Sequence, residues 1–139
     1  MNEMKQLYIA LFLLMSALVT SCGDRGTVWI MNSAENVMWT RPDSALAALK
    51  SIDTLSLKTK AQRARYSLLY TMALDRNHRD IPDLRIIKPA ASYYERHGSN
   101  DDRMKMYFYL GVAQYDTGDP EAAITSYLRA KEYSSRSDN

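Results

Sequence analysis

The segment from residue 107 to residue 130 constrains the fold of this chain more than any other. Its sequence is YFYLGVAQYDTGDPEAAITSYLRA, in which large apolar residues stand beside small ones at helical spacing. Gly118-Asp119-Pro120 predicts a turn in the middle, because Gly permits unusual backbone angles and Pro is tolerated in the first turn of a helix. The segment therefore predicts two short helices that pack against each other.

Five positions of this segment match the tetratricopeptide repeat pattern, Trp-x2-Leu-Gly-x2-Tyr followed by Ala-x3-Phe and a closing Pro over about 34 residues. The matching residues are Tyr107 at the Trp, Leu110 and Gly111 at the Leu-Gly pair, Ala123 at the Ala and Tyr127 at the Phe. Gln114 replaces the Tyr, and Ser135 falls at the closing Pro. Residues 104–137 thus resemble one tetratricopeptide repeat. The resemblance implies a protein-binding scaffold and not an enzyme.

Three prolines are followed directly by an acidic residue, at Pro42-Asp43, Pro82-Asp83 and Pro120-Glu121. Pro fits the first helical turn, and the acid faces the positive end of the helix dipole. Each pair therefore predicts the start of the second helix of a hairpin. The prolines lie 40 and 38 residues apart, which is near the period of a two-helix repeat.

The first helices of the hairpins are predicted at 28–39, 57–75 and 103–116, and the final helix at 122–133. Asn100-Asp101-Asp102 offers N-cap oxygens, Gly98 is predicted to end the preceding helix, and Pro89 is predicted to kink the helix that contains it. The predicted fold over residues 28–139 is all-α, a right-handed superhelix of about three antiparallel hairpins. Because about three such units are needed for stability, the array is near the lower limit of size.

The composition is that of one ordinary globular domain, with 46% apolar and 24% charged residues in 139. The formal net charge of +2 is too small to indicate a nucleic-acid partner. Ten Tyr stand against two Phe. Tyr fills a helix–helix groove while its hydroxyl reaches water, which suits a thin array with little deep interior.

The only cysteine, Cys22, follows a 13-residue apolar run, LYIALFLLMSALV, and then Thr20 and Ser21. The run is too short to span a membrane but fits the core of a signal peptide. Leu18-Val19-Thr20-Ser21-Cys22 resembles the lipobox of bacterial lipoproteins. The resemblance implies cleavage after residue 21, lipidation of Cys22 and anchoring to a membrane on the side away from the cytoplasm, with no choice between inner and outer membrane.

This interpretation divides the chain into a signal peptide (1–21), a lipidated tether (22–27) and a repeat domain (28–139). The alternatives are an uncleaved apolar N-terminal anchor and a plain buried Cys22. Translation from Met4 gives a more basic leader than translation from Met1, so Met4 is the expected start.

No catalytic motif, cofactor site or small-molecule substrate site is predicted, so an enzyme is the least favoured class. His78 and His97 lack further ligands at metal-binding spacing and are expected at the surface. Helix capping explains Asp101-Asp102 better than acid–base catalysis does. The arginines between residues 63 and 79 indicate a solvated helix edge and not a nucleic-acid site.

The repeat resemblance also implies a groove, lined by first helices, that binds a partner protein or peptide. In the last repeat the corresponding residues are Lys105, Phe108, Val112, Tyr115 and Asp116. The expected function is a membrane-anchored scaffold. The alternative is the sensory input part of a membrane-bound tetratricopeptide transcriptional regulator, which segments such as PDSALAALKSID resemble more weakly. The expectation of a further capping helix after residue 133 leaves open whether the array continues.

Overall fold

The computed structural model describes residues 22–137, which form six α-helices and one short 3₁₀ helix, with no strand in that range. The elements are α2 (Cys22–Val37), α3 (Pro42–Lys50), η1 (Thr54–Ser56), α4 (Lys60–Arg76), α5 (Lys88–His97), α6 (Asn100–Asp116) and α7 (Pro120–Ser137). This confirms the all-α prediction. The predicted signal peptide lies outside the described residues.

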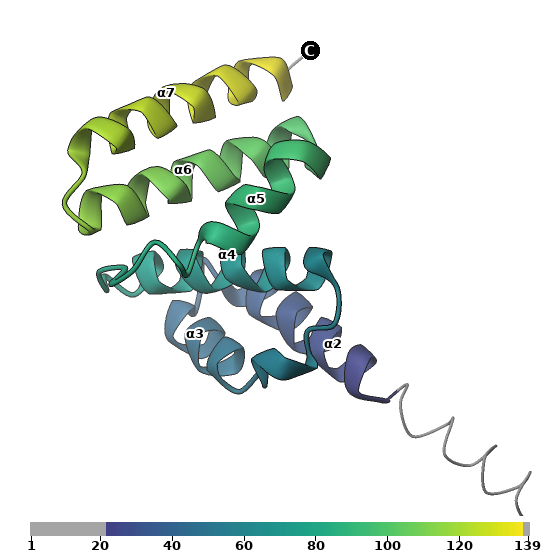
Figure 1. Cartoon of the computed structure of the whole chain (residues 1–139). Coiled ribbons are helices and arrows are strands. Elements are labelled where there is room, and N and C mark those ends of the chain that lie inside the picture. Colours follow the sequence, from purple (N-terminus) through teal and green to yellow (C-terminus); the bar gives the residue numbers. More distant parts are fainter. Residues whose placement is uncertain (1–21, 138–139) are drawn as a thin grey trace, which may run out of the picture.

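The helices pack in sequence order as three pairs, which we call hairpins. α2 packs with α3, α4 with α5 and α6 with α7. Each later pair joins the earlier one through its first helix, because α4 contacts both α2 and α3, and α6 contacts both α4 and α5. Figure 1 shows this series, with α2 and α3 at one end and α7 at the other.

Two of the three predicted Pro starts are confirmed, since α3 begins at Pro42 and α7 at Pro120. The third was wrong, because α5 begins only at Lys88. Asp83, which follows Pro82, accepts hydrogen bonds from the backbone N–H and the side chain of Arg85 and so closes a local turn. Pro89 then falls in the first turn of α5, where its missing N–H is tolerated, so it does not kink the helix.

The starts of α4 and α6 are fixed by two capping boxes. The Thr59 side chain accepts from the N–H of Gln62, and the Gln62 side chain accepts in return from the N–H of Thr59. Ser99 and Asp102 form the same pair in α6. The sequence had predicted the N-cap of α6 among residues 100–102, but the N-cap is Ser99. Gly98 follows the last residue of α5, as predicted.

α4 and α6 are equivalent elements displaced by 40 residues. Both helices have 17 residues, and their capping boxes start at Thr59 and Ser99. Two residues beyond each helix the backbone is left-handed, with φ of 52° at His78 and 88° at Gly118. A 40-residue structural repeat therefore links the second hairpin to the third.

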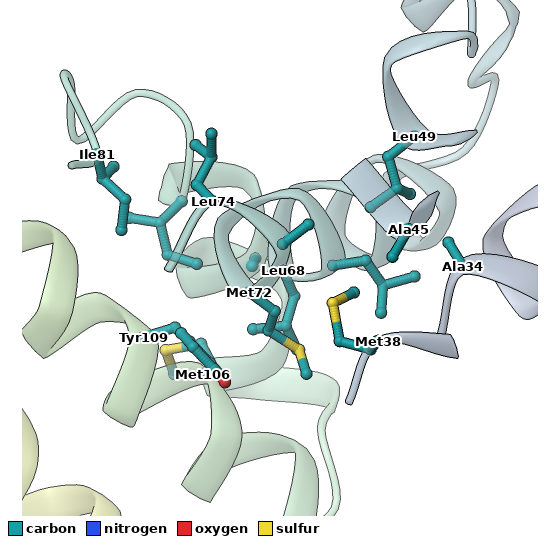
Figure 2. Packing of buried hydrophobic residues seen from close by; sticks show 14 of the residues in the cluster. Ala34, Met38, Ala45, Leu49, Leu68, Met72, Leu74, Ile81, Met106 and Tyr109 are labelled. Atoms are coloured by element: carbon teal, nitrogen blue, oxygen red, sulfur yellow. The ribbon is translucent and has the colours of Figure 1, made fainter. Parts of the chain in front are cut away.

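The core runs continuously through the three hairpins as one cluster of buried residues. Figure 2 shows Met106 and Tyr109 of α6 beside Met72 of α4, while Ala34 and Ala45 mark the contact between the first two helices. The helices also extend beyond two predicted limits. α2 includes residues 22–27, the predicted tether, and α7 continues through 134–137, where the sequence predicted a taper.

Candidate partner-binding face

The five predicted groove residues lie on one side of α6, because their spacing of three or four residues repeats with the helical turn. Their environments differ. Tyr115 and Phe108 are exposed at 66% and 43%, whereas Val112 is half-buried against the core cluster. Lys105 is half-buried and Asp116 is exposed. The structure therefore leaves two aromatic rings and one cation open on this side of α6.

Two of these residues, Asp116 and Phe108, also make contacts that stabilise the fold. Asp116 accepts a hydrogen bond of 2.9 Å from the backbone N–H of Ile81, a buried residue of the loop between α4 and α5. The Phe108 ring makes an edge contact with Tyr109 and a tilted contact with Tyr127, with centroids 5.1 and 5.7 Å apart. Asp116 is consequently a poor residue for testing a partner contact, because its loss also releases the loop.

The same side of the molecule continues over α4, which contacts α6, and over α2, which contacts α4. Arg65 Nη2 of α4 lies 2.6 Å from Glu35 Oε2 of α2, and Lys105 Nζ lies 2.8 Å from Asp101 Oδ2. The hydrogen bond that Lys105 donates to Asp101 raises the pKa of Lys105 above its ordinary value, and the negative charge of Glu35 adds to this effect. We call the surface formed by Glu35, Arg65, Lys105, Phe108 and Tyr115 the first-helix face.

Glu35 is the residue of this face that the sequence did not single out. It lies 30 residues from Arg65, and no periodic pattern links the two positions. Arg65 was expected only as part of a solvated basic edge. The structure gives three arginines of that stretch different surroundings. Arg65 pairs with Glu35, Arg63 donates to the carbonyl of Leu57, and the guanidinium of Arg76 lies 4.5 Å from the centroid of the Trp39 ring.

A hollow of about 650 Å³ lies away from the first-helix face, between the start of α4 and α5. Its lining includes Lys60, Arg63, Arg96 and His97. Arg63 already donates to the carbonyls of Leu57 and Lys58, so this hollow has fewer free cations than its composition suggests. We therefore do not assign it a ligand.

The acidic and histidine residues that the sequence analysis weighed for catalysis or metal binding make contacts that stabilise the fold. Asp102 belongs to the capping box of α6, and Asp101 pairs with Lys105. His78 adopts the left-handed conformation after α4, and the ring of His97 contacts Tyr93 at 4.9 Å. Within residues 22–137 no three His, Cys, Asp or Glu side chains are grouped so as to hold a metal ion. Cys22 is the first residue of α2.

No helix in the described part of the chain is both long enough and apolar enough to cross a membrane. Comparisons of the chain with models of protein families, with curated proteins and with solved structures found no match.

Proposed function

We propose that this chain is a lipoprotein scaffold, anchored through Cys22, that binds an extended segment of a partner protein on its first-helix face. The lipid anchor rests on the lipobox-like sequence before Cys22. The partner-binding role rests on the resemblance to the tetratricopeptide repeat and on the order in which the helices pack.

The packing of the last hairpin supports this resemblance. Gly111 and Tyr127, which match small and aromatic positions of the repeat, lie in direct contact. Ala123 and Ala130 are exposed at only 1% and 6%, as closely packed small residues should be. Gln114, which replaces the expected Tyr, accepts a hydrogen bond of 2.6 Å from Ser126 of α7. A right-handed superhelix is the arrangement that we infer for the three hairpins.

The observation that carries the binding role is the adjacency of α2, α4 and α6. The first helices of successive hairpins thereby form one continuous surface, which carries two ion pairs and the exposed rings of Phe108 and Tyr115. Such a surface suits an extended peptide, because the rings supply apolar contact area while the charges select among sequences.

The proposal is tested by crosslinking the lipidated full chain in its own envelope and identifying the attached proteins by mass spectrometry. We expect Lys105→Glu combined with Tyr115→Ser to reduce the crosslinks to the partner, because the change reverses one charge and removes one exposed ring. Lys50→Glu is the matched control, since Lys50 is an exposed cation of α3.

Asp116 is left unchanged because it holds the loop at Ile81. Circular dichroism should show that both variants keep the helical content of the wild-type chain. Equal crosslinking of wild type, double variant and control would show that the first-helix face is not the binding surface.

A further inference from the structure

A second apolar groove lies between α6 and α7 and shares only Phe108 with the five groove residues predicted from the sequence. It is a shallow groove of about 430 Å³ that is open to solvent. The lining residues, which we call the α6/α7 groove, are Met104, Phe108, Tyr127, Ala130, Lys131 and Ser134. Two of these residues, Phe108 and Tyr127, contact each other with their ring centroids 5.7 Å apart.

The 40-residue repeat gives every lining residue a counterpart in the preceding hairpin. The counterparts, in the same order, are Ala64, Leu68, Ile87, Ala90, Ala91 and Tyr94. None of the six is exposed. Leu68 is 6% exposed where Phe108 is 43% exposed, and Ala64 and Ile87 are fully buried where Met104 and Tyr127 are half-buried. Ala90 and its counterpart Ala130 are both buried.

The difference follows from what packs on each hairpin. α6 contacts both α4 and α5, and the Arg103 side chain donates a hydrogen bond of 3.3 Å to the carbonyl of Tyr94, one of the six counterparts. α6 contributes Met106 and Tyr109, exposed at 0% and 4%, to the shared core. On the third hairpin the only helix that packs extensively against α7 is α6, so the equivalent groove is open among the described residues.

We propose that the α6/α7 groove binds an amphipathic helix of a partner protein, in the position that α6 occupies on α4 and α5. The proposed contact repeats the one that α6 already makes with α4 and α5. The occupant should therefore resemble α6 in its apolar side chains. The helix should carry apolar side chains at i and i+3, as α6 does at Met106 and Tyr109.

Charge adds a second requirement. Lys131 replaces Ala91 in the groove, and it forms no ion pair with another described residue. A carboxylate on the partner helix would meet this cation at the edge of an apolar contact, where water is partly excluded and the attraction is stronger than in bulk solvent. The preferred occupant is therefore an amphipathic helix with an acidic edge.

The test uses a synthetic peptide of residues 99–117, which includes α6 and its capping Ser99, as the probe. A photo-crosslinking residue replaces Arg103 in the peptide, because Arg103 of α6 contacts Tyr94 of α5 and the counterpart of Tyr94 is Ser134 of α7. Binding to the full chain is followed by fluorescence anisotropy. We expect crosslinks to the part of α7 at 127–134 and binding that weakens about tenfold in Phe108→Glu, as for loss of a central aromatic contact.

Ile124→Glu is the matched control, because Ile124 is an exposed apolar residue of α7 whose counterpart Leu84 stays 39% exposed on the hairpin that α6 covers. Binding to this variant should be unchanged. Met104→Glu serves as a second groove variant if Phe108→Glu loses its helical content. Lys131→Glu should weaken binding by a smaller factor and more at low salt.

Three outcomes would overturn the proposal. One is equal binding by Phe108→Glu, Met104→Glu and Ile124→Glu. Another is crosslinking to 87–94 of α5, which would mean that the peptide displaces α6. The last is dimerisation of the full chain that Phe108→Glu abolishes, because a second copy would then be the occupant. Since Lys105 and Tyr115 do not line this groove, the crosslinking test of the first-helix face succeeds or fails separately.

Discussion

The contact between Gly111 of α6 and Tyr127 of α7 decides how closely these two helices approach. A Cβ atom at Gly111 would lie 2.6 Å from Cε1 of Tyr127, well inside van der Waals contact. At Gly26, on the exposed side of α2, a Cβ would have no neighbour within 4 Å. The two glycines are both helical, but only Gly111 is required by packing.

Gly111→Ala should therefore lower the free energy of unfolding by about 1–3 kcal/mol, because the Tyr127 ring must move out of its packed position. Gly26→Ala is the matched control and should raise it by about 0.5–1 kcal/mol, since Ala is the better helix former. Urea unfolding followed by circular dichroism measures both values. A Gly111→Ala variant as stable as Gly26→Ala would contradict the close contact.

Burial raises the pKa of both Tyr94 and Tyr109 to about 12. In the unfolded chain a tyrosine titrates near 10. As the pH rises from about 10 to about 12, the unfolded state loses these protons while the folded state keeps them. Their contribution to stability is thus complete below pH 10 and is lost as the pH approaches 12.

We expect the free energy of unfolding to fall over that pH window, and the phenolate absorbance of the folded chain to show late-titrating tyrosines. Tyr109→Phe should remove one of these and make the fall shallower. Tyr115→Phe is the control, because Tyr115 is 66% exposed. If Tyr115→Phe and Tyr109→Phe change the pH profile equally, burial of Tyr109 is not the cause.

At the scale of elements, α4 and α6 end in the same way with different residues. Each is followed after one residue by a left-handed position, occupied by His78 after α4 and by Gly118 after α6. A residue with a Cβ atom is less stable in this conformation than Gly by about 1–2 kcal/mol. The second hairpin therefore contains a local strain that the third avoids.

His78→Gly should raise the free energy of unfolding by up to about 1 kcal/mol, the relief of strain being partly offset by the greater flexibility of Gly in the unfolded chain. Gly118→Ala is the reciprocal variant and should lower it. Thermal and urea unfolding give both differences. A destabilised His78→Gly variant would mean that the His78 side chain makes a contribution larger than the strain.

At the scale of the whole molecule, Cys22 and the α6/α7 groove lie at opposite ends of the series of hairpins, since α2 begins at Cys22 and α7 packs beyond α6 (Figure 1). A lipid on Cys22 would hold α2 close to the membrane surface. The third hairpin would then be directed away from the lipid, where a partner can approach both proposed surfaces.

Lipidation is tested by growing cells that express the chain with an alkyne-labelled fatty acid. The wild-type chain should take up the label and sediment with membranes, whereas Cys22→Ser should do neither, because Cys22 is the only cysteine of the chain. Gly26→Ala controls for the effect of a substitution nearby. Retention of label by Cys22→Ser would rule out the proposed anchor.

The sequence predicted the structure correctly where the interacting residues lie in one short segment. Gly118-Asp119-Pro120 brings α7 back onto α6, and the repeat match assigned Gly111 and Tyr127 to two helices that pack together, where the structure shows them in contact. The same reasoning failed at Pro82, because the preceding Ile81 is held by Asp116, 35 residues further along the chain. A signal read from neighbouring residues does not contain that constraint.

The sequence by itself determined the helical class, the last hairpin and the residues that permit its close packing, since these depend on helical period and turn chemistry. Only the tertiary structure decided that Glu35 faces Arg65, that α4 and α6 are equivalent, and that Phe108 lies in an open groove while its counterpart Leu68 is covered. The physical reason is that burial depends on which helix packs above a residue. Equivalent positions in successive hairpins therefore differ in exposure, although both lie in helices of the same length with the same type of N-cap.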